Sequence, residues 1–356
     1  MYLEAFQQQL LPGHAADRSH RLDYASRFER WDDRAGVRRK PRRSYEAGGG
    51  PGLGLFFPPE LYPVALHPLV AARGETTVHR LLLQRLYDYL AFTTELESVA
   101  VIPVAIKISR SRSGLPLPEH MQADAFKIVT DEAWHAQFSD DFARQVAAET
   151  GCASQNLAGT PPAFLPRLDE LRDRLPAHVR GVESLLFAIV SETLISGILA
   201  GIPRDGRLPQ SVREVVRDHA EDEGRHHVYF RSMLRHLWSG LTPRERRAIG
   251  PLVPSVIYAF LEPDYARAAD HLAAAGLSAP ESDQVIAESW PSAATQAEVA
   301  EAASPLVRYL QEAGVFEDAR THEAFESSGL LDAGPSSRSI VADGAPLLCT
   351  PKEFTR

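Results

Sequence analysis

A run of 19 residues, from Ser184 to Ile202, limits the folds open to this chain more than any other feature. Its sequence, SLLFAIVSETLISGILAGI, holds a single charged side chain, Glu192, near its middle. About 20 apolar residues can span a bilayer, but a lone carboxylate at the bilayer centre costs about 2.5–3.5 kcal/mol, and no second span accompanies it. We therefore expect a helix buried on all sides inside a soluble protein, and a specific reason for burying Glu192.

The composition is that of an ordinary soluble globular protein. The 356 residues carry a net charge of −9, with 24% charged and 44% hydrophobic residues. No clustered basic excess suggests a nucleic-acid surface. Cys152 and Cys349 are too few and too far apart for a disulfide scaffold or a zinc ribbon. The N-terminus lacks the basic start and apolar stretch of a signal peptide, so we expect a cytoplasmic protein without a membrane segment.

Apolar residues recur at helical spacing from about residue 76 onward. They predict four long helices, over about 76–106, 119–149, 178–201 and 210–239, followed by helices near 242–262, 279–289 and 292–313. Pro103 marks a kink or an end of the first helix, and Gly151 ends the second. No alternating pattern predicts a strand. The expected fold is all-α, a four-helix bundle with additional C-terminal helices.

The chain is expected to form one main domain with two flanking segments. Residues 1–60 form an N-terminal arm packed on the body, residues 61–330 the helical domain, and residues 331–356 a loosely ordered tail. The basic stretch RAGVRRKPRR at 34–43 is interpreted as part of a loosely packed surface arm and not as a polyanion site. GGGPGLG at 48–54 is interpreted as a flexible connector, since no strand precedes it.

Two of the long helices carry the same short motif. The first reads Asp131-Glu132-x-x-His135 and the second Asp222-Glu223-x-x-His226. Residues three apart share one helix face, so each Glu and His can bind one ion. With 27 Glu and 13 His, about one Glu-x-x-His pair is expected by chance. Two copies on separate helices, both preceded by Asp, are not.

Each of the other two long helices offers one carboxylate for the same site. These are Glu192 and Glu97, which we prefer to Glu95 because an apolar turn follows it. One Glu from each of two helices and one Glu-x-x-His from each of two others is the ferritin-like di-iron or di-manganese arrangement. Imidazole and carboxylate suit iron, and bridging carboxylates offset the repulsion between two ions. Metal-bound histidines usually donate their other nitrogen to an acceptor, for which Asp131 and Asp222 are candidates.

A third histidine, His219, lies on the same face as the second motif. His219, Glu223 and His226 stand at positions 0, 4 and 7, within an arc of about 60°. His227 points about 100° away from His226, so we expect it to be structural or exposed. Before Glu97, the first helix carries residues that line a substrate pocket or form plain core: Tyr87, Tyr89, Phe92 and Thr93.

Taken in order, these residues resemble the non-haem di-iron arylamine N-oxygenases of the ferritin-like superfamily, typified by p-aminobenzoate N-oxygenase. The resemblance covers roughly residues 25–310, and the RFERWDDRAGVRR segment is also similar. Its most specific element is His219, because ordinary ferritin-like sites have two histidines. The resemblance implies that seven residues bind two iron ions: Glu97, Glu132, His135, Glu192, His219, Glu223 and His226.

The resemblance also implies an activity. The reduced di-iron centre would bind O₂ as a peroxo-di-ferric species and oxidise the nitrogen of a small aromatic amine to hydroxylamine, nitroso or nitro product. No flavin or nicotinamide motif is present, so an external reductase or ferredoxin-like protein would supply the electrons. A homodimer is expected.

The same ligand pattern serves other proteins. A di-iron desaturase or carbon hydroxylase of an acyl or aromatic substrate is one alternative, although an acyl-carrier-protein desaturase is not expected to have His219. A ribonucleotide reductase subunit would need a radical tyrosine about one turn after the first motif, where this chain has Ser139. A metal-binding or structural helical bundle without enzyme activity is a further alternative, and without metal it would bury several carboxylates unpaired.

Overall fold

The chain folds into helices, and no strand occurs in residues 8–12, 22–45, 54–155 and 161–331, which the structure, a computed structural model, describes. The predicted all-α, ferritin-like class is confirmed on these residues. The glycine-rich connector, except its last residue, and the C-terminal tail lie outside the described residues.

Four helical segments form the bundle. The first is α5 (Glu75–Glu95), which continues through a π-helical turn (Leu96–Val101) into α6 (Ile102–Ser109). The others are α7 (Glu119–Thr150), α9 (Val182–Leu199) and α10 (Gln210–Gly240). The other α-helices among the described residues are α2 (Trp31–Arg34), α3 (Gly36–Arg39), α4 (Pro68–Ala71), α8 (Phe164–Arg174), α11 (Pro243–Ile249), α12 (Val253–Leu261), α13 (Tyr265–Ala274), α14 (Ala279–Ser289), α15 (Ser292–Glu312) and α16 (Ala319–Ser327).

The four long helices occur where the sequence predicts them, with local differences. Pro103 does not end the first segment: it directly follows the π-helical turn, and the helix continues past it to Ser109. Gly151 ends α7 with a φ of 66°, a left-handed conformation that favours glycine. The segment expected at 242–262 is two helices, α11 and α12. Helices α8, α13 and α16 were not predicted, since their short segments lack a long apolar period.

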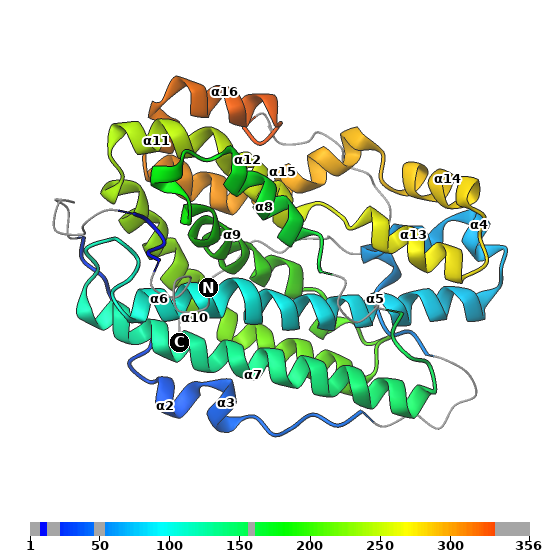
Figure 1. Cartoon of the computed structure of the whole chain (residues 1–356). Coiled ribbons are helices and arrows are strands. Elements are labelled where there is room, and N and C mark those ends of the chain that lie inside the picture. Colours follow the sequence, from blue (N-terminus) through cyan, green and yellow to red (C-terminus); the bar gives the residue numbers. More distant parts are fainter. Residues whose placement is uncertain (1–7, 13–21, 46–53, 156–160, 332–356) are drawn as a thin grey trace.

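Helix α9 contains the apolar run and is the centre of the molecule. It packs against α10 and α6 of the bundle and against α8, α12 and α15 on its other side. Because neighbours cover it all round, every face can be apolar. In Figure 1 the C-terminal helices α11, α12, α15 and α16 lie above α9, and α5 and α7 lie below it.

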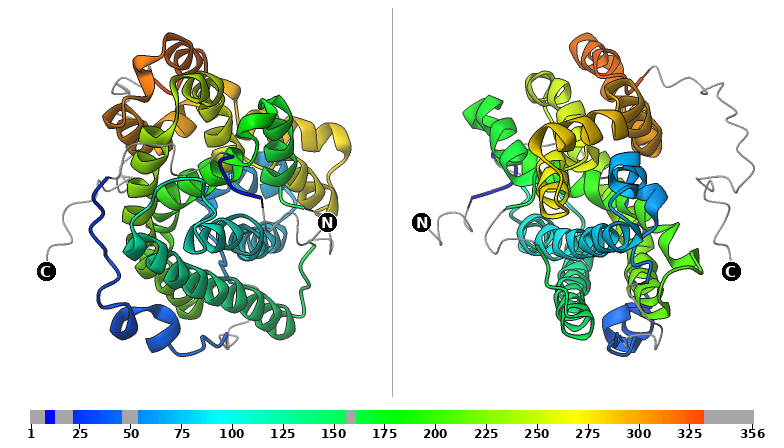
Figure 2. Two further views of the ribbon diagram at one scale, coloured as in Figure 1. Left: turned by 60° about the vertical axis from the view of Figure 1, so that its left-hand side comes forward. Right: turned by 90° about the vertical axis from the view of Figure 1, so that its right-hand side faces the viewer.

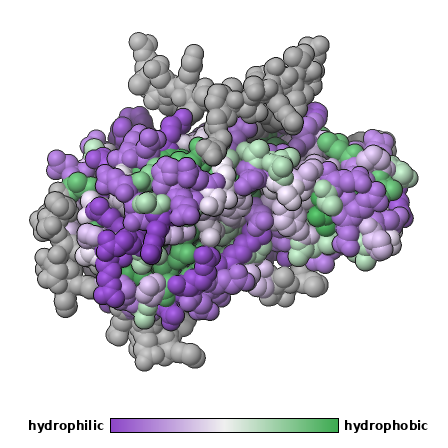
Figure 3. All heavy atoms as spheres, turned by 90° about the horizontal axis from the view of Figure 1, so that it is seen from above, coloured by the Kyte–Doolittle hydropathy of each residue, from purple (hydrophilic) through white to green (hydrophobic). Residues whose placement is uncertain are grey.

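Two described segments are long and apolar enough to cross a membrane, Val182–Arg204 and Glu75–Ser109. The prediction that no second segment is long and apolar enough to span a membrane was therefore wrong. About 76% of the most apolar window in the first segment is buried inside the protein, as in the core helix of a soluble bundle. The face shown in Figure 3, which looks onto the C-terminal helices, is mostly hydrophilic with scattered apolar groups.

Helices α2 and α3 of the N-terminal arm lie on the opposite side of the bundle from the C-terminal helices. Helices α2 and α3 pack below α7 and α10 (Figures 1 and 2). Phe28 and Trp31 are buried there, with exposed fractions of 1% and 6%. Over residues 22–45 the arm is therefore not the loosely packed segment that its polar sequence suggests. The division of the chain into arm, domain and tail stays a prediction.

Candidate metal centre

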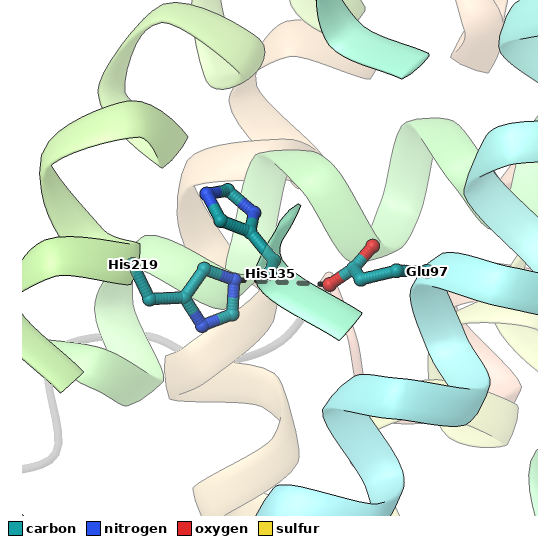
Figure 4. A group of neighbouring side chains, drawn as sticks. All are labelled: Glu97, His135 and His219. Carbon is teal, nitrogen blue, oxygen red and sulfur yellow. Dashed lines mark ion pairs between the residues drawn. The ribbon is translucent and has the colours of Figure 1, made fainter. Parts of the chain in front are cut away.

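A cluster of buried carboxylates and imidazoles lies in the middle of the bundle. The structure brings together all seven residues predicted as ligands, in two groups whose nitrogen and oxygen atoms lie within 4.8 Å of one another. The first group is Glu97, His135 and His219, and the second is Glu132, Glu192, Glu223 and His226. All seven side chains are fully buried. In Figure 4, Glu97 and His219 point toward one another from opposite helices, and His135 lies behind them.

Helix geometry explains how each residue reaches the centre. Glu132 and His135 are one turn apart on α7, and three residues of α10 share one face over two turns. Glu97 lies in the π-helical turn that follows α5. The wider π turn interrupts the regular helical period, and such turns often occur at functional sites. Here Glu97 faces the centre, whereas Glu95 is exposed.

Two carboxylates of the second group, Glu132 and Glu223, contact histidines of both groups. Glu132 Oε2 is 2.8 Å from His135 Nδ1, and Glu132 Oε1 is 2.8 Å from His226 Nδ1. Glu223 Oε1 is 3.4 Å from each of the same two nitrogens. Both histidines thus present Nδ1 to the centre. Glu132 and Glu223 therefore link the histidines of the two groups.

The third histidine, His219, faces the centre with Nε2 rather than Nδ1. His219 Nε2 is 3.2 Å from Glu223 Oε1 and 3.7 Å from Glu97 Oε1. Its Nδ1 lies 3.3 Å from the hydroxyl of Tyr89, one of the aromatic residues that precede Glu97. The Tyr89 contact can fix the orientation and tautomer of the ring.

Many polar atoms of the cluster lack hydrogen bonds. Some of them lie within ion-pair distance of one another, such as Glu132 Oε1 and His226 Nδ1. Within the part of the chain that the structure describes, however, no aligned hydrogen bond is found for either carboxylate oxygen of Glu97, Glu192 and Glu223, nor for Glu132 Oε1, His219 Nε2 and His226 Nδ1. Buried polar groups are normally paired, because an unpaired one costs several kcal/mol. Nitrogen and oxygen atoms left unpaired at one point are what a bound metal ion would satisfy.

The pKa values in the cluster show how strongly it needs positive charge. Burial, and then repulsion from nearby carboxylates, raises the pKa of Glu97 and Glu192 well above the ordinary range. Burial also opposes ionisation of Glu223, but the charges and hydrogen bonds of His226 and His219 together outweigh it and hold the pKa of Glu223 well below its usual value. Burial disfavours the charged form of His226, yet Glu132 and Glu223 raise its pKa well above normal. Protons balance the carboxylates where no metal does.

The two aspartates of the motifs lie just outside the cluster in a crossed arrangement. Asp131 Oδ2, on α7, is 3.2 Å from Nε2 of His226 on α10. Asp222 Oδ2, on α10, is 3.3 Å from Nε2 of His135 on α7. Each aspartate therefore serves the histidine of the other motif. Since it accepts at Nε2, it favours the tautomer whose Nδ1 lone pair faces the centre.

Three residues that contact these aspartates were not predicted. Trp31 and Gly36 of the arm donate hydrogen bonds to Asp131 and Asp222, respectively. Arg225, inside the second motif, forms an ion pair with Asp222 and lies 3.7 Å from Asp131. In the sequence, Trp31 and Gly36 stand out only as a tryptophan and a glycine within a charged stretch. Nothing in the sequence indicates that they contact the aspartates.

Other residues singled out from the sequence lie away from the cluster. His227 is half-buried, and its Nε2 is 3.0 Å from the hydroxyl of Tyr309 on α15. Tyr87 donates to the carbonyl of Cys152, and Phe92 packs against Phe164 and Phe260. Of the residues considered for a pocket, Tyr87 and Phe92 are thus core, and Tyr89 contacts the cluster.

Two comparisons with known proteins relate this chain to one group of enzymes. A family model described as "P-aminobenzoate N-oxygenase AurF" matches residues 53–314, most of the chain. The chain is also 24% identical over 233 residues to a 4-aminobenzoate N-oxygenase from Streptomyces thioluteus, which covers 63% of this chain and 67% of that protein. The family match spans all seven clustered residues.

Proposed function

Because the chain belongs to the p-aminobenzoate N-oxygenase AurF family and is an N-oxygenase, we propose that it uses two iron ions and O₂ to oxidise the nitrogen of a small aromatic amine. A similar protein is named for 4-aminobenzoate, so aminobenzoates are the first substrates to test. The product would be the hydroxylamine or its nitroso or nitro successors. The family match favours this function over the desaturase, carbon hydroxylase and non-enzymatic alternatives.

The observation that carries the proposal is the buried, unpaired donor set. Four carboxylates and three histidines meet in one place with most of their oxygens unpaired. Four buried negative charges without cations would be strongly unfavourable, whereas two divalent ions would balance their formal charge. The mixed nitrogen and oxygen set suits iron. The residues present therefore fit the two ions.

Each residue has a role that follows from its position. Glu97, His135 and His219 would hold one ion, Glu192 and His226 the other, and Glu132 and Glu223 would contact both. Bound there in reduced form, iron would supply the electrons and the binding position needed to activate O₂. Asp131 and Asp222 keep the imidazole protons on Nε2, away from the metal side. The apolar α9 excludes bulk water from one wall.

The reaction needs electrons that an amine substrate does not supply in the first step. Conversion of an amine to a hydroxylamine uses one O₂, two electrons and two protons. One oxygen atom enters the N–O bond and the other leaves as water. We propose that a reductase or ferredoxin-like protein in the same compartment, the cytoplasm, donates the electrons, and that the enzyme works as a homodimer.

Metal analysis tests the site. Protein expressed with iron should contain two irons per chain. Replacing Glu97 with Ala should lower this content, whereas Glu95→Ala, two residues away and exposed, should not. Iron far below two per chain in the unaltered protein would contradict the di-iron centre.

Isotope labelling tests the reaction. With a chemical reductant, ¹⁸O₂ and 4-aminobenzoate, mass spectrometry should find ¹⁸O on the amine nitrogen. Label on a ring carbon, or turnover only of an acyl substrate, would contradict N-oxygenation by this site.

A further inference from the structure

The described N-terminal arm reaches the metal centre through two hydrogen-bonded chains. On α2, Trp31 Nε1–H donates to both carboxylate oxygens of Asp131, at 2.9 Å each. On α3, the backbone N–H of Gly36 donates to both oxygens of Asp222, at 3.1 Å each. Through the crossed contacts, Trp31 is linked to His226 and Gly36 to His135. The arm thus holds one carboxylate behind one histidine of each group.

Both chains are closed to solvent. The side chains of Asp131 and Asp222 are 0% and 1% exposed. Hydrogen bonds in such surroundings are electrostatically stronger than in water, and a lost donor leaves a buried carboxylate less well satisfied. Arg225 lies beside both aspartates and offsets part of their charge. These contacts hold both aspartates in place as hydrogen-bond acceptors for the two histidines.

The position of Gly36 has no room for a side chain. A Cβ added there would overlap Asp222 Oδ2 and the indole ring of Trp134. The backbone of α3 therefore approaches the aspartate as closely as only glycine allows. Trp31 is likewise enclosed, with the guanidinium of Arg38 4.9 Å above its ring.

The arm is fixed to the bundle on both sides of these contacts. Before α2, Ser26 Oγ donates to Asp124 of α7 at 2.6 Å. After α3, Arg43 makes two hydrogen bonds to Asp218 of α10, at 2.6 and 3.0 Å. Lys40 lies 3.2 Å from the same aspartate. Residues 26–43 therefore form a clamp that joins α7 to α10, the two helices that carry the Glu-x-x-His motifs.

We propose that this clamp, residues 26–43, positions the two histidines for metal binding, with Trp31 setting His226 and Gly36 setting His135. The inference rests on the proposed function, because it requires two metal ions in the cluster. Trp31 and Gly36 touch neither metal nor substrate and act only through the aspartates. Each should control one ion: Trp31 the ion of the Glu192 group, and Gly36 the ion of the Glu97 group.

Two variants and two matched controls test the clamp. Trp31→Phe removes the indole donor and keeps an aromatic ring, and Gly36→Ala displaces the backbone donor. Trp238→Phe is the control for the first, because Trp238 is also buried but its Nε1 has no hydrogen-bond partner among the described residues. Gly206→Ala is the control for the second, since an added Cβ there meets nothing within 4 Å.

The measurement is the loss of Fe²⁺ from each anaerobic protein to a ferrous chelator, with Co²⁺ absorption spectra as a second readout. Substituting partners behind metal ligands typically weakens metal binding about 10- to 100-fold. We expect Trp31→Phe to speed the loss of the ion held by the Glu192 group by about this factor. We expect Gly36→Ala to speed the loss of the ion held by the Glu97 group, and both variants to show altered Co²⁺ absorption bands. The controls should match the unaltered protein, and circular dichroism should show unchanged helix content.

The possible results distinguish a failure of the proposed clamp from a failure of the proposed metal site. If the unaltered protein binds two ions and both clamp variants release them at its rate, the clamp is wrong and the site stands. If a folded variant speeds release of both ions equally, the arm acts as general packing and the assignment is overturned. If the unaltered protein binds no metal, the proposed function fails, and the clamp fails with it. If Gly36→Ala does not fold, the rate of metal loss from Trp31→Phe alone still tests whether the clamp positions the histidines.

Discussion

At the scale of single residues, the centre gathers groups that are costly to bury and leaves many of their polar atoms without hydrogen bonds. Glu192 is the clearest case, since it is the only charge in a long apolar run and is fully buried. His219 is another, because a hydroxyl holds one of its nitrogens while the other faces two carboxylates. Substitutions at this scale test the metal directly.

Replacing Glu192 with Gln should reveal the cost of the buried charge. Burial raises the pKa of Glu192 well above 4.5, so the folded, metal-free protein binds this proton more tightly than the unfolded chain. The contribution of Glu192 to stability therefore falls as pH rises above about 4.5. Metal-free Glu192→Gln should lose less stability with rising pH, measured as melting temperature across a pH series. An identical pH dependence in both proteins would count against this account.

The same variant should respond weakly to metal. A ligand at 100 times its dissociation constant stabilises the folded state by about 2.7 kcal/mol. The unaltered protein should show such an increase on adding Fe²⁺ anaerobically, and Glu192→Gln a clearly smaller one. Denaturant unfolding with and without metal measures the difference.

Tyr89→Phe should weaken the hold on His219 without disturbing the fold. The change removes the hydroxyl that lies 3.3 Å from His219 Nδ1. We expect a loss of metal affinity or turnover of about 10-fold or more. Tyr87→Phe is the matched control, since its hydroxyl donates to the carbonyl of Cys152 instead. Equal effects of the two variants would show that the hydroxyl on His219 has no special role.

At the scale of helices, α9 joins the bundle to the C-terminal layer. Phe187 of α9 stacks on Phe164 of α8, with ring centroids 4.9 Å apart, and lies edge-on to Phe260 of α12 at 6.1 Å. All three rings are buried. Aromatic packing thus continues from the helix that carries Glu192 into the helices outside the bundle.

Truncating Phe187 should therefore destabilise the whole protein. Phe187→Ala leaves a cavity in a close-packed region and should cost about 3–5 kcal/mol of unfolding free energy. Phe126→Ala, on an exposed position of α7, should change it by no more than about 0.5 kcal/mol. Equilibrium denaturation of the metal-free variants gives both values. A small effect at Phe187 would mean that the C-terminal layer is not coupled to α9.

At the scale of the whole molecule, burial favours helices of a protein core over membrane spans for the segments that composition leaves open. Two segments pass a hydropathy test for membrane spans, yet neighbours on all sides cover α9. We expect the expressed protein to remain in the supernatant after ultracentrifugation of a lysate without detergent. Recovery in the membrane pellet, released only by detergent, would contradict a soluble bundle.

Much of the bundle and of the cluster follows from sequence patterns alone. Apolar spacing predicts α7 and α10 almost to the residue, because long amphipathic helices with proline and glycine at their ends carry strong local signals. Short helices such as α8 and α13 carry weak local signals and were not predicted. The cluster was predictable because its members lie at fixed helical offsets, or stand alone in apolar surroundings, as Glu192 does.

The amino-acid sequence by itself determined the long helices, the apolar core helix and the residue types suited to bind a metal, because each depends on neighbours within a few turns. Only the tertiary structure decided how these parts meet. Asp131 serves His226 across 95 residues, and Gly36 reaches Asp222 across 186. Hydrogen bonds between distant segments follow from the packing of helices and leave no periodic trace, so a polar arm could be recognised as part of the centre only once folded.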